Sequence, residues 1–239
     1  METAGKSPIV VMKRYEMKYI LDPEQTDLLI KGLEGHLLPD AYGLTSIASL
    51  YYDTPDYLLV RRSIEKPRFK EKIRLRSYGM ATEQTPVYLE LKRKADGIVY
   101  KRRVQTTIPL VKQFFDGDGD ICAKGQINSE IRYFRDYYKS LVPACLIIYD
   151  RVAYFEPDGD LRLTLDYAPR YRVADLNLTK SMYGTLLLPE GSTILEIKVQ
   201  GAMPLWLADL LSRGKIYKTS FSKYGAAYTE QLMGVTQKG

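Results

Sequence analysis

The sequence predicts an α+β protein in which an antiparallel sheet of eight strands closes into a barrel around a tunnel, with flanking helices. Three observations lead to this prediction: segments of alternating polar and apolar residues recur along the 239-residue chain, turn residues separate several of them, and helix-start signals lie between them. No repeat of fixed period occurs. We therefore expect a single domain over residues 1–239, with residues 1–9 flexible.

The strands are expected from the alternation and from the turns between them. One hairpin, over 87–104, has Asp96-Gly97 at its turn, and a second has Pro157-Asp158-Gly159. Side chains along a strand alternate between its two faces, so each alternating segment predicts one polar and one apolar face. The eight predicted strands are 12–21, 46–53, 68–78, the two strands within 87–104, 144–155, 161–167 and 193–200.

Helices are expected between the strands. Asp22 as the N-cap, Pro23 at the first helical position and Gln25 at the capping-box position predict a helix that ends near residues 32–35. Segment 175–191 has the weakest pattern and is expected to be a loop. Further helices are predicted over 56–62, from 108 onward, and over 127–139, 204–211 and 223–232.

Composition and charge restrict the class of protein. The chain has 35 Lys and Arg against 29 Asp and Glu, and the net charge of +6 indicates an anionic partner such as nucleic acid, anionic lipid, polyphosphate or nucleotide. Two cysteines and one histidine are too few for a disulfide scaffold or a Cys/His zinc site. The first ten residues lack an apolar signal core and no apolar run is long enough to span a membrane, so we expect a cytoplasmic protein.

Charged residues gather on one face of several predicted strands. Three strands carry a Glu-x-Lys pair and another carries Lys-x-Arg-x-Arg, which places like charges on one face of the sheet. In a barrel this face would point inward. The charged residues expected there are Glu16, Lys18, Lys72, Arg74, Arg76, Glu90, Lys92, Lys101, Arg103, Arg151, Arg162, Asp166, Glu196 and Lys198.

The predicted inward face has too few carboxylates to pair with every cation. Burying that many unpaired cations would be very costly, and a polyanion in the lumen would remove the cost. Phosphate chains suit this role because each Lys or Arg can donate charge-assisted hydrogen bonds to phosphate oxygens. The interleaved carboxylates could hold a divalent metal that bridges phosphates.

Nine short motifs occur along the chain in a fixed order. They are R-Y-E-M-K-Y at 14–19, S-L-Y-Y-D-T-P at 49–55, K-I-R-L-R at 72–76, Y-L-E-L-K at 88–92, Y-K-R-R at 100–103, Y-D-R at 149–151, L-R-L-T-L-D at 161–166, L-E-I-K at 195–198 and F-S-K-Y at 221–224. The ordered set covers nearly the whole chain. It resembles the VTC domain, the polyphosphate polymerase domain of the triphosphate tunnel metalloenzyme (CYTH-like) superfamily, in a bacterial-type stand-alone form.

The resemblance implies a polyphosphate polymerase that transfers the γ-phosphoryl group of ATP onto a growing polyphosphate chain, with Mn²⁺ or Mg²⁺ as cofactor. It implies catalytic roles for Arg74, Arg76, Lys92 and Lys198. It implies substrate-binding roles for Lys18, Lys72, Lys101, Arg103, Arg151, Arg162 and Lys223. Glu196 would be the principal metal ligand, with Glu16, Glu90 and Asp166 near the metal or orienting lysines.

Other functions remain open at this point. The same tunnel could hydrolyse inorganic triphosphate or a nucleotide, or it could hold polyphosphate without turnover. Nucleic-acid binding is not expected, because the 20 tyrosines occur on both strand faces and in helices, as core tyrosines would. The Gly-x-x-x-x-Gly-Lys-Ser/Thr motif of P-loop enzymes is absent from the sequence. Fungal members carry membrane segments, so a separately encoded membrane partner is a further expectation.

Overall fold

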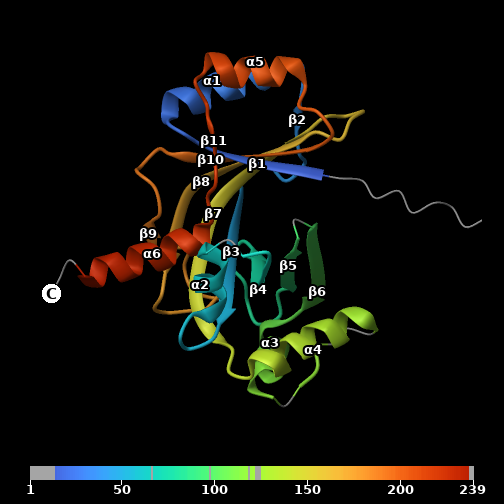
Figure 1. Ribbon diagram of the computed structural model, residues 1–239, viewed down its shortest axis with the longest axis vertical. Coiled ribbons are helices and arrows are strands. Elements are labelled where there is room, and N and C mark those ends of the chain that lie inside the picture. Colours follow the sequence, from blue (N-terminus) through green and yellow to red (C-terminus); the bar gives the residue numbers. More distant parts are fainter. Residues whose placement is uncertain (1–13, 66, 97, 118, 122–124, 237–239) are drawn as a thin grey trace, which may run out of the picture.

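The computed structural model describes residues 14–65, 67–96, 98–117, 119–121 and 125–236 (Figure 1). The predicted flexible segment 1–9 lies outside this range, as do the first two residues of the predicted strand 12–21. Gly97 of the predicted Asp96-Gly97 turn is also outside it. Asp96, which is described, has the positive φ of 47° that a tight hairpin turn favours.

All eight predicted strands are present, in one antiparallel sheet that has eleven strands in the described part of the chain. The path of hydrogen-bonded neighbours is β11-β1-β10-β8-β7-β3-β4-β5-β6, with β2 paired to β7 and β9 paired to β8. The three strands absent from the prediction, β2, β9 and β11, are only two residues long. The bounds are β1 Arg14–Leu21, β2 Leu38–Pro39, β3 Thr45–Asp53, β4 Phe69–Tyr78, β5 Val87–Ala95, β6 Ile98–Thr106, β7 Val142–Phe155, β8 Arg162–Arg172, β9 Thr185–Leu186, β10 Thr193–Gln200 and β11 Lys218–Thr219.

The predicted closure into an eight-stranded barrel is not confirmed. Among the described residues, no strand pairing joins β6 to the β1–β11 end of the sheet. β11 occupies the free edge of β1 at Lys18 and Tyr19, where a closing strand would otherwise pair. The sheet is nevertheless curved (Figure 1). The curvature brings Lys92 on β5 near enough to Glu16 and Lys18 on β1 for their charges to act on its pKa. The two ends of the strand order therefore face each other across a concave side.

Six helices are described, near the predicted positions. The capping box is confirmed: the backbone N–H of Gln25 donates to Asp22 at 2.8 Å, and the Gln25 side chain accepts from the backbone N–H of Asp22 at 3.1 Å. In the portion of the chain that is described, no helix has the length and apolar character needed to cross a membrane. The bounds are α1 Pro23–Leu33, α2 Leu58–Ile64, α3 Ile108–Asp116, α4 Gln126–Tyr138, α5 Leu205–Arg213 and α6 Lys223–Thr236.

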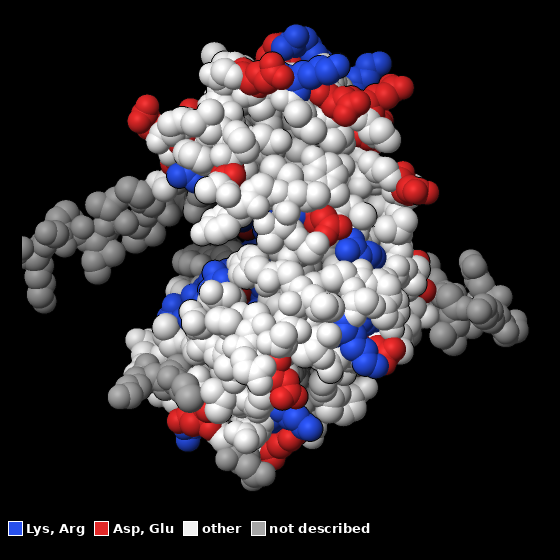
Figure 2. Space-filling model, turned by 180° about the vertical axis from the view of Figure 1, so that it is seen from behind, with Lys and Arg blue, Asp and Glu red and all other residues white. Residues whose placement is uncertain are grey.

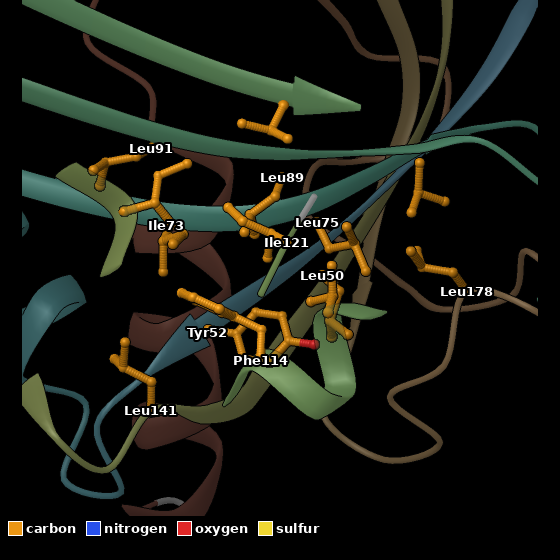
Figure 3. Packing of buried hydrophobic residues seen from close by; sticks show 14 of the residues in the cluster. Leu50, Tyr52, Ile73, Leu75, Leu89, Leu91, Phe114, Ile121, Leu141 and Leu178 are labelled. Carbon is orange, nitrogen blue, oxygen red and sulfur yellow. The ribbon is translucent and has the colours of Figure 1, made fainter. Parts of the chain in front are cut away.

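The convex side of the sheet is apolar and is covered by two pairs of helices. Helices α3 and α4 pack against β3–β6, where Phe114 lies under the sheet in one cluster with Ile73, Leu75, Leu89 and Leu91 (Figure 3). Helices α1 and α5 lie together over β1, β8 and β10, at the opposite end of the molecule (Figure 1). Because strand side chains alternate, burial of these apolar residues turns their charged neighbours toward the concave side.

A third apolar cluster lies at one end of the concave side. Tyr224 and Ala227 of α6 pack, together with Val60 of α2, against residues of β3 and β7 that include Tyr51 and Ile147. Helix α6 therefore starts directly beside the charged part of the concave face, whereas α1, α3, α4 and α5 are on the other side of the sheet.

Candidate functional site

The concave face brings together charged side chains from seven strands and from the start of α6. Ten are cations and four are carboxylates, which leaves a large positive excess in one place. Figure 2 shows a hollow between the two halves of the molecule, with Lys and Arg side chains beside it. The set consists of Lys18, Lys72, Arg74, Arg76, Lys92, Lys101, Arg103, Arg151, Lys198 and Lys223, with Glu16, Glu90, Asp166 and Glu196.

Glu90 is the centre of the first cluster, on β5. Its buried carboxylate accepts a hydrogen bond from Arg74 Nε at 2.8 Å, and Lys101 Nζ lies 2.9 Å from its Oε1. Arg103 Nε and Arg76 Nε lie 3.6 Å and 3.8 Å from the same carboxylate. Burial opposes the ionisation of Glu90, but Arg74, Arg76 and Lys101 outweigh it and lower the pKa of Glu90 to about 2. Glu90 is therefore a fixed anion that holds four cations together.

Tyr51 extends this cluster onto β3. The register of β3 and β4 places Tyr51 opposite Arg74, and Arg74 Nη1 donates to the Tyr51 hydroxyl at 3.0 Å. Burial raises the pKa of Tyr51, but the cations Arg74, Lys72 and Arg76 outweigh it and lower this pKa to about 8. Burial, together with the neighbouring lysines, lowers the pKa of Lys72 to about 8. This part of the face is thus strongly electropositive.

Arg76 is held by hydroxyl groups on the neighbouring strands. Its guanidinium donates to Ser49 Oγ and to the Tyr149 hydroxyl, both at 3.2 Å. Arg76 is only 6 % exposed, so these hydroxyls replace much of the water that the guanidinium loses on burial. The guanidinium is held in one orientation on the concave face.

Asp166 on β8 is the centre of a second cluster. Its Oδ1 accepts a hydrogen bond from Arg151 Nε, and its Oδ2 accepts one from Arg151 Nη2 at 2.9 Å. Lys223 Nζ also donates to Oδ2. Lys223 also lies over the ring of Tyr149, 4.4 Å from its centroid. Burial opposes ionisation of Asp166, yet Lys223 and Arg151 lower its pKa. One buried carboxylate therefore positions two cations from different elements.

Glu196 on β10 is the centre of a third cluster. It forms ion pairs with Lys198 and, at 3.6 Å, with Lys18, whose Nζ also lies 3.8 Å from Glu16. Burial opposes the ionisation of Glu196, but Lys198 and Lys18 lower its pKa well below the usual range. Lys92 faces this cluster from β5. Among the described residues, no carboxylate lies within 4.0 Å of the Lys92 or Lys72 ammonium group.

One residue of the predicted site lies apart from these clusters. Arg162 pairs with Lys198 across β8 and β10, as the alternation predicts. Its guanidinium, however, donates to the carbonyl oxygens of Glu156, Gly159 and Leu161 in the β7–β8 hairpin. The structure places all the other predicted site residues in the three clusters or directly facing them.

The four predicted metal ligands are not brought together as one group. Within the described ranges, no three Asp, Glu, His or Cys side chains come close enough to share a metal ion. Glu90 and Asp166 are enclosed by cations. Glu16 and Glu196 flank the same Lys18 ammonium group, so these two carboxylates are neighbours. Two carboxylates, completed by oxygen atoms of a bound anion, would fit Mg²⁺ or Mn²⁺, which prefer oxygen ligands.

Hydroxyl side chains are functional groups to which the sequence analysis gave no role. Tyr51 and Tyr149 bind the site arginines, Ser49 supports Arg76, and Ser222 accepts from Lys72 Nζ at 3.0 Å. The sequence contained a signal for three of them. Ser49 and Tyr51 alternate along β3, and Tyr149 is two residues from Arg151, so period-two spacing alone places them on the charged face.

Comparisons with known proteins identify the fold and the family of the chain. The chain has the fold of a putative adenylyl cyclase from Hippeastrum that reveals a dominant triphosphatase activity: the TM-score is 0.56 at 18% identity, over 91% of this chain and 96% of that one. For a putative adenylate cyclase from Bacillus halodurans, the TM-score is 0.54 at 14% identity, over 87% of this chain and 92% of that one. No curated protein sequence matched. The profile of the VTC domain matches residues 13–231. The chain therefore belongs to the VTC domain family.

Proposed function

We propose that the protein is a metal-dependent polyphosphate polymerase that transfers the γ-phosphoryl group of ATP onto a growing polyphosphate chain. The observation that carries the proposal is that ten cations and only four carboxylates lie together on one concave face. Membership of the VTC domain family supports it. A linear phosphate chain carries the complementary charge along its whole length, and each phosphate oxygen can accept from Lys or Arg.

The arrangement of the cations suits the binding and orientation of a triphosphate. Lys72 and Lys92 have no carboxylate partner within 4.0 Å in the described part of the chain, so they can bind phosphate oxygens without breaking an ion pair. Arg74 and Arg76 are already oriented by Glu90, Tyr51 and Tyr149 and offer further N–H donors. Phosphoryl transfer depends mainly on in-line positioning and charge neutralisation. A site of fixed cations can supply both without a covalent nucleophile.

Glu16 and Glu196 are the residues that would hold a divalent cation. When bound, Mg²⁺ or Mn²⁺ would neutralise charge on the phosphate oxygens and favour departure of the nucleoside diphosphate. Lys18 and Lys198, which pair with these carboxylates, would then turn toward phosphate oxygens. Lys92 lies on the facing strand, so the phosphate chain would be held from both sides.

Triphosphate hydrolysis is the second candidate. The Hippeastrum protein of similar fold reveals a dominant triphosphatase activity, and the same cations would bind inorganic triphosphate equally well. The two reactions differ in the acceptor: a phosphate chain accepts the γ-phosphoryl group in one and water in the other. The polymerase is preferred because the matching family is the VTC domain.

Product analysis tests this proposal. The purified protein is incubated with ATP and Mn²⁺, and the products are resolved on a gel and by phosphate release, with Arg76→Ala as the inactive control. Long phosphate chains plus ADP are the result expected of a polymerase. Orthophosphate without chains would contradict it in favour of a triphosphatase. No turnover in the presence of both ATP and tripolyphosphate would contradict both activities.

A further inference from the structure

Consecutive residues at the start of α6 contact three separate strands of the concave face. The carbonyl oxygen of Phe221 accepts a hydrogen bond from Lys18 Nζ at 3.3 Å, and Ser222 Oγ accepts from Lys72 Nζ at 3.0 Å. The next residue, Lys223, donates to Asp166. This short segment therefore bridges cations and a carboxylate that lie on β1, β4 and β8.

Tyr224 follows immediately and is turned into the protein. Its side chain is buried, and its hydroxyl donates to Asp53 Oδ2 at 2.8 Å. Its ring stacks on Tyr51, with 4.6 Å between the ring centroids. Burial and the Asp53 carboxylate raise the pKa of Tyr224, so the phenol keeps the proton that it donates. Tyr224 thus ties the first turn of α6 to β3.

Asp53 is a rigid acceptor for this bond. It is fully buried at the end of β3, and it also accepts from the backbone N–H groups of Thr54 and Leu59, both at 2.8 Å, and of Val60 at 3.0 Å. These donors fix both carboxylate oxygens against the start of α2. Burial of Asp53 raises its pKa, and the hydrogen bonds oppose that shift. A carboxylate held in this way cannot follow α6 if the helix moves.

We propose that Asp53 and Tyr224 are positioning residues, and that their hydrogen bond fixes the first turn of α6 so that Lys223 is held at the polyanion site. This inference rests on the proposed function, because it concerns how the same site holds a phosphate chain. The Tyr224 ring does lie beside the first cluster, stacked on Tyr51 and 5.9 Å from Lys72 Nζ, but these contacts use the ring and not the hydroxyl that binds Asp53. The effect is transmitted through the backbone of one helical turn.

The physical reason lies in the ends of helices. The first turn of a helix has N–H groups without intrahelical partners and frays easily. A lysine side chain also has large rotamer freedom, so a mobile backbone would spread the Lys223 ammonium group over many positions. The Tyr224–Asp53 bond removes the backbone part of this freedom before any ligand binds. The conformational entropy lost on binding is then smaller, and the affinity is higher.

Tyr224→Phe is the direct test, because it removes only the hydroxyl. The probe is inorganic tripolyphosphate, and its Kd is measured by titration calorimetry with the full chain. The Kd is expected to rise roughly tenfold, as for the loss of one hydrogen bond to a charged acceptor. The matched control is Tyr228→Phe, one turn further along α6, where the ring lies against Tyr57 at 5.4 Å between centroids. Its Kd should change less than about twofold.

A double-mutant cycle separates positioning from general stability. In a Lys223→Met background, adding Tyr224→Phe should change the Kd less than about twofold, because the residue being positioned is already gone. A full tenfold loss in that background would overturn the inference. So would a Tyr224→Phe protein that melts at a lower temperature but binds tripolyphosphate like the wild type.

A second variant keeps the test decisive if Tyr224→Phe does not fold. Asp53→Asn replaces one of the two accepting oxygens with an amide NH2 group, which faces two hydrogen-bond donors whichever way the amide is turned. The anchor is therefore weakened, and the Kd should shift in the same direction. An unchanged Kd for Asp53→Asn would contradict the inference. Failure of the wild-type protein to bind tripolyphosphate would overturn the proposed function itself. If the wild type binds and the Kd of Tyr224→Phe is the same, only the positioning role is overturned.

Discussion

Glu90 on β5 accepts a hydrogen bond from Arg74 on β4 at 2.8 Å, and this pair lies where four cations of the concave face converge. Without the Glu90 carboxylate, Arg74, Arg76, Lys101 and Arg103 would face one another with no counter-charge. The site is therefore assembled around fixed anions, and the cations that exceed them in number are available to a ligand.

Glu90→Gln should destabilise the ligand-free protein at neutral pH by about 3 kcal/mol, because the pKa of Glu90 falls from 4.5 to about 2 on folding. A carboxyl with a depressed folded pKa contributes stability above its unfolded pKa, and that stability is lost as the pH falls. The difference in the free energy of unfolding between wild type and variant should therefore reach its maximum above pH 4.5 and disappear near pH 2. Urea unfolding across this range measures it. Glu83→Gln, at an exposed position, is the control.

Lys92→Met should weaken polyanion binding without weakening the fold. Burial is the main cause that lowers the pKa of Lys92, and the charges of Glu16 and Glu196 only partly oppose it, so removal of the ammonium group relieves a cost of burial in the ligand-free protein. The free energy of unfolding should stay the same or rise, while the Kd for tripolyphosphate rises roughly tenfold. Lys112→Met, on the exposed face of α3, should change neither quantity. Loss of stability with unchanged binding would assign Lys92 a structural role.

Binding of tripolyphosphate should weaken as the pH rises through about 8. Lys72 loses its positive charge and Tyr51 gains a negative one in this range, since the pKa of each is about 8. In the ligand-free protein, the charged form of Lys72 destabilises the fold below about pH 8, and this penalty disappears toward pH 10.5. The variant Lys72→Arg with Tyr51→Phe should have a flatter dependence of Kd on pH. Titration of tripolyphosphate itself affects both proteins equally. If the Kd of the variant depends on pH as steeply as that of the wild type, Lys72 and Tyr51 are not the cause of the dependence.

Glu196→Gln should raise the metal concentration needed for half-maximal activity by roughly tenfold, since it would remove one of two neighbouring carboxylates. Asp166→Asn is the matched comparison, because Asp166 is enclosed by Arg151 and Lys223 and lies in a different cluster. Its metal requirement should stay close to that of the wild type. If Glu196→Gln needs the same metal concentration as the wild type, Glu196 is not a metal ligand.

The strands and the polar face were predictable because both depend on local sequence. The Glu-x-Lys and Lys-x-Arg-x-Arg patterns determine which side chains share a face once a strand forms, and the observed β1, β4, β5 and β10 follow them. The capping box at Asp22 is equally local. Lys223 was named only through the family resemblance, since no periodicity links the start of α6 to β8.

The pairing within the site was not predictable, because it depends on contacts between distant segments. Asp166 meets Arg151 only through the register of β7 and β8, which shifts between Ile148 and Asp150. The guanidinium of Arg162 turns to hairpin carbonyls although its strand position faces the site. Closure of the sheet is also non-local: alternation predicts a strand, but it cannot say that β11 takes the edge of β1.

A crystal structure with tripolyphosphate and Mn²⁺ bound is the most direct measurement of whether the concave face is a phosphate-chain site. The phosphate chain should lie between β1 and β10 on one side and β4 and β5 on the other, with oxygens within hydrogen-bond distance of Lys72, Lys92 and Arg74. The metal should lie at Glu16 and Glu196. Ligand bound outside the concave face, with the Lys92 and Lys72 ammonium groups in contact with water alone, would contradict the assignment.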